Sequence, residues 1–205
     1  GDGGSAAAGL VCKAAQALFE HTYFNFLTKH RGLAGFMTEF GAVGGNAGEL
    51  AHLNGLLAAA DGHLQSWAYW QLKKYADFTT ANAAESLYDK EGRLEVRKLA
   101  VLSRTYAPIV GGLPLRMAFD PGTAAFELEF NATVAGAPTE VYLNEEVHYP
   151  NGYTIEVSPE HCLQVSKPET NRIHLFLSED GACLGHAVRV RLRAGAAPPA
   201  ALLAV

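Results

Sequence analysis

The spacing of hydrophobic positions divides the chain into two parts. Up to about residue 110, apolar residues recur at three- and four-residue intervals over long stretches, and short apolar runs separate these stretches. The first pattern is typical of amphipathic helices and the second of buried strands. Beyond that point, short runs of alternating apolar and polar residues are divided by Pro, Gly, Asn and Asp, which is typical of strands joined by turns. We therefore expect two structural regions.

The first region predicts an alternation of helices and strands. Its predicted elements are a helix over residues 6–30, a strand over 35–41, a helix over 46–62, a strand over 64–71 and a helix over 94–106. Asn46 followed by Glu49 is the signature of a capping box at a helix start. Alternating helices and strands favour parallel βα units. Because two strands cannot cover the apolar faces of these helices, we expect further units upstream of residue 1.

The second region predicts an antiparallel β-sandwich. Its seven predicted strands cover residues 115–119, 125–130, 139–143, 153–157, 162–165, 173–177 and 187–193. Phe126, Leu128 and Phe130 alternate with Glu127 and Glu129, so one face of that strand is expected to be buried. Short strands at regular spacing are typical of a sandwich. The predicted organisation is thus an α/β domain over 1–110, an all-β sandwich over 111–193 and a tail over 194–205.

Composition and charge narrow the function classes. Hydrophobic residues make up 49% of the chain and charged residues 18%, which favours a packed core over disorder. The net charge of −5 and the absence of a Lys/Arg run argue against a nucleic-acid partner. No apolar run is long enough to span a bilayer. The eight His and three Cys show no convergent metal-ligand spacing, and we expect no metal and no cofactor.

The cysteines leave two interpretations open. Cys162 and Cys183 either form a disulfide or remain two unreactive thiols. The only glycosylation sequon, Asn131-Ala132-Thr133, favours a secretory route, although the compartment is not fixed by the sequence.

Glu39 is the main candidate for chemistry. It lies near the end of the predicted strand over 35–41, and in parallel α/β folds active sites form where strands end. Under strict alternation, Met37 and Gly35 share its face. The functional interpretation is a carboxylate that faces the lumen of a barrel. The alternative is a strand-end carboxylate that caps a helix or pairs with an arginine.

The two tryptophans of the stretch Ser66-Trp67-Ala68-Tyr69-Trp70-Gln71 are candidates for substrate binding. Trp70 ends the predicted strand, and an indole ring there can stack on the apolar face of a sugar. Trp67 points to the opposite face of the strand, for which core packing is the alternative interpretation.

Together these stretches resemble a known family. Thr38-Glu39-Phe40-Gly41, residues 66–71, residues 102–112 and Tyr149-Pro150-Asn151-Gly152-Tyr153 occur in an order and spacing similar to the C-terminal part of glycoside hydrolase family 5 enzymes. The similarity is greatest to endoglycoceramidases and related glycolipid glucosidases, and it covers roughly residues 30–180. It implies the last βα units of a (β/α)8 TIM barrel followed by a β-sandwich C-terminal domain.

The resemblance also implies roles for particular residues. Glu39 matches the nucleophile of a retaining glycosidase, and Trp70 matches an aromatic residue beside the cleaved bond. The family's acid/base glutamate belongs to an Asn-Glu-Pro motif, which this chain lacks. We therefore expect that glutamate upstream of residue 1 and no activity from the isolated chain.

The implied substrate is a glycolipid or another glycoside. Peripheral contact with membrane lipid and a monomeric full-length protein are expected as well. Alternatives within the family are a steryl-glucosidase and a glucanase. An alternative of another class is a non-catalytic module that binds carbohydrate or lipid, or a sandwich that only stabilises its barrel.

Overall fold

The chain forms two compact units, which divide between Leu102 and Ser103. This computed structural model describes residues 15, 18–19, 22–26, 34–73, 85–179 and 181–196. The boundary lies eight residues before the position suggested by the sequence pattern, 110/111. The difference arises because residues 103–110 belong to the second unit and include a strand of it, Tyr106–Ile109.

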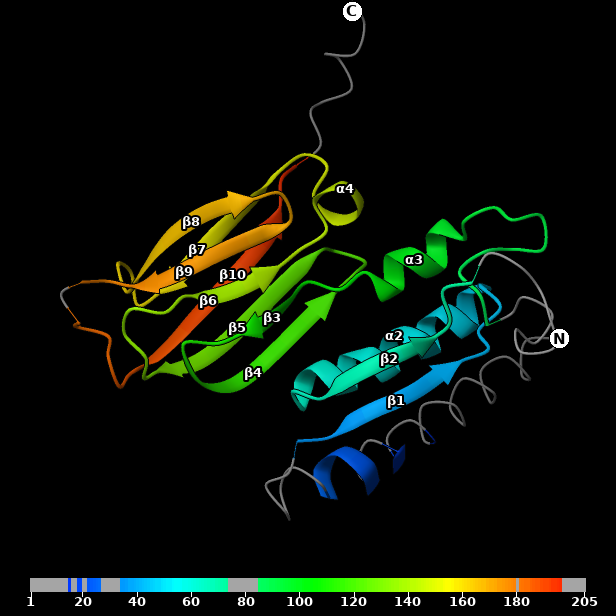
Figure 1. Ribbon diagram of the computed structural model, residues 1–205, viewed down its shortest axis with the longest axis horizontal. Helices are drawn as coiled ribbons and strands as arrows, with labels where there is room; N and C mark the ends of the chain where they lie inside the picture. Colours follow the sequence, from blue (N-terminus) through cyan, green and yellow to red (C-terminus); the bar gives the residue numbers. More distant parts are fainter. Residues whose placement is uncertain are drawn as a thin grey trace, which may run out of the picture. The chain divides into compact units, whose positions relative to one another are not determined.

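The first unit contains a pair of parallel strands. Strand β1 (Phe36–Gly41) pairs with β2 (Ser66–Trp70), and helix α2 (Ala47–Gly62) connects them (Figure 1). Helix α3 (Val96–Leu102) follows β2 in the chain. The predicted succession of strand, helix, strand and helix is therefore confirmed.

The predicted helix over residues 6–30 lies largely outside the described residues. Those that are described, namely 15, 18–19 and 22–26, are helical. Phe24 of this segment is buried against Ala59 and Ala60 of α2.

Helix α2 begins at the predicted capping box. The Asn46 side chain accepts a hydrogen bond from the Glu49 backbone N–H over 3.0 Å, and the Glu49 carboxylate accepts one from the Asn46 N–H over 3.3 Å. Two N–H groups that the helix leaves unpaired are thereby satisfied. Leu53 and Leu57 of α2 are buried together with Leu102 of α3, so α2 packs through the face that carries these leucines.

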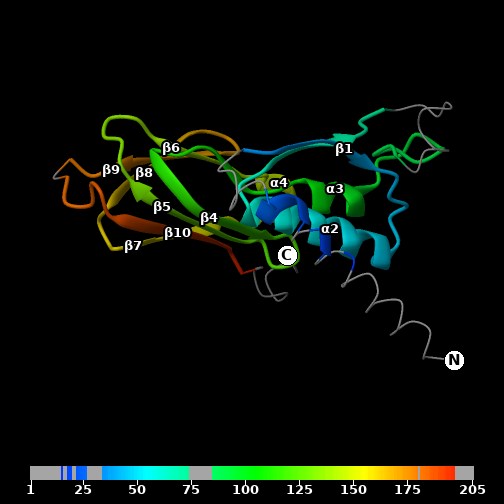
Figure 2. The same cartoon turned by 90° about the horizontal axis from the view of Figure 1, so that it is seen from below.

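The second unit consists of two four-stranded antiparallel sheets in two layers (Figure 2). One sheet has the order β4-β5-β10-β7 and the other the order β3-β6-β9-β8. Their strands are β3 (Tyr106–Ile109), β4 (Gly112–Asp120), β5 (Ala125–Ala132), β6 (Thr139–Tyr142), β7 (Tyr153–Ser158), β8 (Leu163–Glu169), β9 (Arg172–Leu177) and β10 (Ala187–Ala194). A short helix, α4 (Glu145–His148), follows β6.

All seven predicted strands of this unit are present, and β3 is an eighth. The sequence pattern extends the preceding helix through Tyr106, and Pro108 with the nearby Gly111 and Gly112 resembles a linker. Helix α3 ends at Leu102, and Tyr106 pairs with Tyr142 of β6. Because β3 is an edge strand, Pro108 costs the sheet no internal hydrogen bond.

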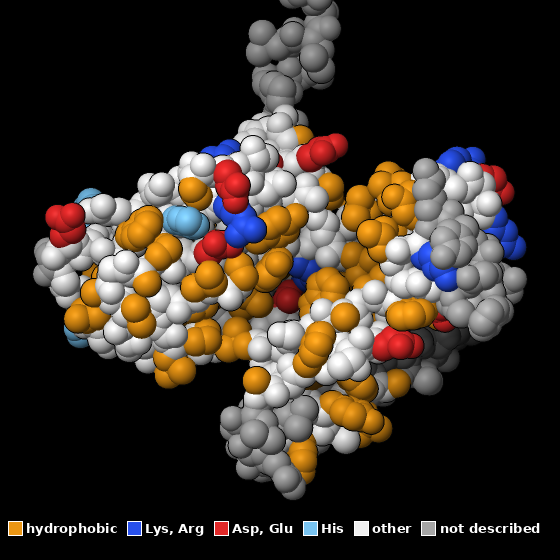
Figure 3. Space-filling view, viewed as in Figure 1, with side chains coloured by type: hydrophobic (Ala, Val, Ile, Leu, Met, Phe, Trp, Pro, Cys, Tyr) orange, Lys and Arg blue, Asp and Glu red, His pale blue; other side chains and the backbone are white. Residues whose placement is uncertain are grey.

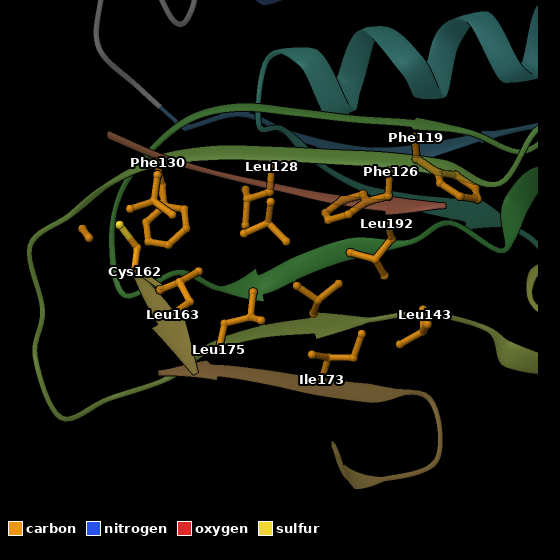
Figure 4. Close-up of a cluster of buried hydrophobic side chains, with 14 of the residues drawn as sticks. Phe119, Phe126, Leu128, Phe130, Leu143, Cys162, Leu163, Ile173, Leu175 and Leu192 are labelled. Carbon is orange, nitrogen blue, oxygen red and sulfur yellow. The ribbon is translucent and has the colours of Figure 1, made fainter. Parts of the chain in front are cut away.

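The core of the second unit lies between the two sheets. Figure 4 shows Phe126, Leu128, Phe130 and Leu192 of one sheet facing Ile173 and Leu175 of the other. All six side chains are at most 2% exposed. They occupy alternate positions of their strands, which is the period-two pattern read from the sequence.

Cys162 and Cys183 form a disulfide. It joins the residue before β8 to the loop that precedes β10. Of the two interpretations that the sequence left open, a disulfide and two unreactive thiols, the structure therefore shows the disulfide.

None of the helices in the described part of the chain is long and apolar enough to cross a bilayer. Within the same residues, no three His, Cys, Asp or Glu side chains come together as a metal site.

Candidate functional site

Glu39 lies in a β-bulge of β1. Phe36 and Met37 pair with Ser66 and Trp67, whereas Phe40 and Gly41 pair with Tyr69 and Trp70. The two residues between these pairs, Thr38 and Glu39, therefore stand opposite the single residue Ala68. An extra residue in one strand is the definition of a bulge, and bulges re-aim side chains and are frequent beside active sites.

The bulge interrupts the alternation expected along β1. Thr38 and Glu39 are both exposed, whereas Phe40 packs edge-on against Trp67 and Tyr69 at ring distances of 5.6 and 5.5 Å. Strict counting by two from Glu39, which gave Met37 and Gly35 as its companions, therefore does not describe this strand.

The Glu39 carboxylate has no hydrogen-bond or ion-pair partner among the residues that the structure describes. The carboxylate that caps α2 is that of Glu49. The alternative interpretation of Glu39, as a capping or arginine-paired group, is therefore not realised in this part of the chain. An exposed carboxylate at the end of a parallel strand is sterically open to a ligand.

Trp70 ends the neighbouring strand and lies directly opposite Gly41. A β-carbon on Gly41 would collide with the backbone carbonyl of Trp70, so the two strands approach closely two residues beyond Glu39. The Trp70 side chain is 40% exposed, and the peptide bond after it is cis. The indole is thus accessible on the strand adjacent to Glu39.

Trp67 occupies a different environment. It packs with Phe40 and Tyr69 against the cluster of Leu53 and Leu57, and also against the cluster around Phe24. The structure thus places Trp67 on the helix-covered side of the strand, with Tyr69 and not with Trp70.

A cavity of about 570 Å³ lies beside β1. Its walls include Glu39 and Phe36 of β1, Phe19 of the N-terminal helical segment, and His52 and Leu56 of α2. Among the described residues, β2 is the only strand that pairs with β1. A mostly apolar cavity with one carboxylate suits a ligand that has both apolar and polar parts.

Lys98 is a buried group that the sequence pattern did not single out. It is fully buried in α3, and its Nζ lies 2.9 Å from both the Ser86 carbonyl oxygen and the Glu95 carboxylate. Lys98 therefore holds the segment after β2 to α3. In the sequence, the only sign of this contact is a lysine at a helix position that points inward.

Tyr69 of β2 has a shifted pKa. Burial, followed by the charges of Glu95 and Glu85, raises the pKa of Tyr69 to about 12.

Comparison with known proteins gives three consistent results. Residues 104–191 match the glycoside hydrolase family 5 C-terminal domain. The chain is 35% identical to an endoglycoceramidase of Cyanea nozakii over 129 residues, which are 61% of this chain and 26% of that protein. It is 31% identical to endoglycoceramidase I of Rhodococcus hoagii over 131 residues, 64% of this chain and 23% of that protein. The chain thus spans about a quarter of the length of these relatives.

Solved structures extend the similarity in fold. Endo-glycoceramidase II from Rhodococcus sp., determined as a lactosyl-enzyme intermediate, superposes with a TM-score of 0.68 at 16% identity, over 93% of this chain and 40% of that one. Sterylglucosidase 1 of Cryptococcus neoformans gives a TM-score of 0.66 at 14% identity, over 90% and 32%. At these identities the likeness concerns the fold alone. The resemblance to the C-terminal part of family 5 enzymes is thereby confirmed, and this chain carries a glycoside hydrolase family 5 C-terminal domain.

Proposed function

We propose that this chain supplies the nucleophile of a retaining glycoside hydrolase that cleaves the O-glycosidic bond of glycolipids. In this proposal β1 and β2 are the last strands of a (β/α)8 barrel. The observation that carries it is the Glu39 carboxylate, which is exposed in a bulge near the end of a parallel strand, one strand away from Trp70. The substrate class is supported by the endoglycoceramidases among the relatives.

The chemistry follows from the two carboxyl groups of a retaining mechanism. The Glu39 carboxylate attacks the anomeric carbon and forms a glycosyl ester, while a second carboxylic acid protonates the departing oxygen. That second group then removes a proton from water, which hydrolyses the ester. Trp70 stacks on the sugar and holds it in position for the attack. The groups must stand about 5–5.5 Å apart for direct attack.

The second carboxyl group is proposed to come from outside these 205 residues, because the chain has no Asn-Glu-Pro motif. Glu39 alone can complete only half of the cycle. The isolated chain is therefore expected to hydrolyse no β-glucoside.

The decisive experiment uses the complete gene product and an activated 2-deoxy-2-fluoro-β-glucoside, which traps the glycosyl ester. We expect a covalent adduct on the peptide that contains Glu39. In Glu39→Gln the adduct is absent and kcat falls at least ~10³-fold, because the nucleophile is lost. Glu91→Gln is the matched control, since Glu91 is an exposed carboxylate paired with Arg93, and it should keep wild-type activity. An adduct on another residue, or full turnover by Glu39→Gln, contradicts the assignment.

A second candidate substrate is a steryl glucoside, favoured by the structural likeness to sterylglucosidase 1. The two proposals differ in the product, since one releases ceramide and the other a sterol. A glucanase releases neither product and shortens an oligosaccharide instead.

A non-catalytic role is the candidate from another class. It requires a complete gene product without an Asn-Glu-Pro motif on a strand before residue 1. A purely scaffolding sandwich is tested by removing residues 114–205 from the complete protein. Lower stability with unchanged substrate preference would support that role.

The compartment and the oligomeric state of the protein are part of the same proposal. A disulfide between Cys162 and Cys183 is typical of oxidising compartments, which supports a secretory route. We also propose that the full-length protein is a monomer and makes peripheral contact with membrane lipid.

A further inference from the structure

The two sheets of the sandwich have different outer faces. On the sheet β4-β5-β10-β7, Arg189 pairs with Glu129 at 2.9 Å and Arg191 with Glu127 at 2.8 Å. Such cross-strand pairs form a solvated ladder. On the sheet β3-β6-β9-β8, the outward positions carry rings around a charged centre, namely Tyr106, Tyr142, His174 and Phe176 around Glu140 and Arg172. We call this second surface the Glu140 face.

Glu140 is the fixed centre of this face. It occupies an outward position of β6, yet its side chain is only 12% exposed. One carboxylate oxygen pairs with Nη1 of Arg172, and the other lies 3.4 Å from Nε2 of His174. Arg172 is held in addition by Glu169, whose carboxylate lies 2.7 Å from Nε. The guanidinium and the imidazole are therefore fixed in orientation.

Both groups keep binding capacity towards solvent. The Arg172 side chain is 44% exposed and that of His174 25% exposed. The ion pairs of Arg172 use Nη1 and Nε. Nη2 can therefore donate a hydrogen bond to a ligand, and the ion pairs already fix the orientation of the guanidinium. Nδ1 of His174 is a further polar atom on this face.

Aromatic rings border the polar centre on both sides. Tyr106 and Tyr142 lie with ring centroids 5.5 Å apart, and the His174 and Phe176 rings lie 6.1 Å apart. Figure 3 looks onto this face and shows a basic side chain between two acidic ones, a histidine beside them and hydrophobic side chains to either side. The combination of exposed rings and fixed planar polar groups is absent from the Arg–Glu ladder of the other sheet.

We propose that the Glu140 face binds a neutral oligosaccharide. One sugar ring stacks on Tyr142 or Tyr106, and its hydroxyl groups accept from Arg172 and exchange hydrogen bonds with His174. The ligand is neutral because the guanidinium of Arg172 is already paired with the carboxylates of Glu140 and Glu169, which leaves no unpaired positive charge for an acidic ligand. This site uses no residue of β1 or β2, so it goes beyond the role proposed for Glu39.

The test is a titration of the 205-residue chain with lactose, followed through backbone amide shifts. The chain carries Trp70→Ala, so that the exposed indole of the first unit cannot contribute to binding. We expect saturable shifts at amides of β6 and β9. Tyr142→Ala and Arg172→Ala should each weaken the affinity three- to tenfold, because the first removes the stacking ring and the second a fixed donor. Tyr142→Phe should keep the affinity within twofold.

Arg189→Ala is the matched control, since it removes an equally exposed arginine from a cross-strand pair on the opposite sheet. It should leave the lactose affinity unchanged. Melting temperatures of all variants identify any that fail to fold, and Tyr142→Phe then remains the variant with an intact sheet. Absence of lactose shifts at β6 and β9 at tens of millimolar, or equal affinities in Tyr142→Ala, Arg172→Ala and Arg189→Ala, would overturn the proposal. Hydrolysis assays on Glu39 variants are independent of either outcome.

Discussion

Gly41 and Trp70 face each other across the β1–β2 pair, and the carbonyl oxygen of Trp70 occupies the space into which a β-carbon at position 41 would project. The glycine in Thr38-Glu39-Phe40-Gly41 is thus required by the close approach of two backbones. This requirement lies two residues after the residue proposed as nucleophile.

Gly41→Ala should therefore destabilise the first unit. The added methyl group meets backbone atoms, which cannot rotate away, so we expect a loss of about 1–3 kcal/mol. Thermal or urea unfolding measures it. Gly62→Ala provides the comparison, because a β-carbon there meets nothing within 4 Å, and it should be neutral or slightly stabilising. Equal stability of the two variants would argue against the close approach.

Lys98→Ala should cost more than a typical surface change. It leaves the buried Ser86 carbonyl and the partly exposed Glu95 carboxylate without their shared ammonium group, for which we expect a loss of about 3 kcal/mol. Arg97→Ala, an exposed neighbour on α3, should stay within about 0.5 kcal/mol of wild type. Urea unfolding of both variants checks the difference, and a similar small loss in both would show that the Lys98 contacts contribute little.

The disulfide should stabilise the second unit. Cys162 and Cys183 are 21 residues apart, and closing a loop of that size in the unfolded chain corresponds to roughly 3 kcal/mol. Unfolding in guanidinium with and without a thiol reductant measures this contribution. Cys162→Ser/Cys183→Ser should match the reduced wild type and show no response to the reductant. A wild-type curve that is unaffected by complete reduction would contradict the expected contribution.

The Arg–Glu ladder predicts a particular pH dependence. The hydrogen bond from Arg191, together with nearby arginine charges, lowers the pKa of Glu127 below its usual 4.5. The unfolded state therefore takes up the proton first as the pH falls. The stabilisation is complete above about pH 4.5 and is lost as the pH falls through the lower, folded pKa.

Glu127→Gln should accordingly be less stable than wild type near neutral pH, by up to about 1 kcal/mol, and the difference should shrink in acid. Melting temperatures at several pH values between 3 and 7, a range chosen to span carboxylate titration, check this. Glu160→Gln, an exposed carboxylate, should show a pH profile parallel to wild type. A difference for Glu127→Gln that stays constant down to the lowest pH would contradict the mechanism.

The elements of the fold were largely predictable because local patterns determine them. Helix α2 carries its start signal in Asn46 and Glu49, and β5 carries strict alternation in Phe126, Leu128 and Phe130. Strand β3 was missed because Pro108 and the glycines that follow the strand, Gly111 and Gly112, resemble a linker, and only pairing with β6 makes it a strand. Pairing across the chain is a long-range property that no local window contains.

In the candidate site, too, local patterns were predictable from the sequence and long-range pairing was not. Glu39 and Trp70 were found through strand position and family resemblance, and they stay predictions for catalysis and binding. The bulge that exposes both Thr38 and Glu39 depends on the register with β2, which the sequence pattern does not reveal. The Glu140 face likewise depends on the alignment of β6 with β9, although the outward positions of His174 and Arg172 on β9 follow from alternation with Ile173.

The bulge of β1 has a consequence for how such a site can change during evolution. Because Thr38 and Glu39 together stand opposite Ala68, the pairs on either side of them are anchored independently of what these two residues are. Substitutions at either position can therefore alter the chemistry at the strand end without moving the register of the sheet. A protein built in this way can lose or regain an acidic group at this point while the rest of its architecture stays intact.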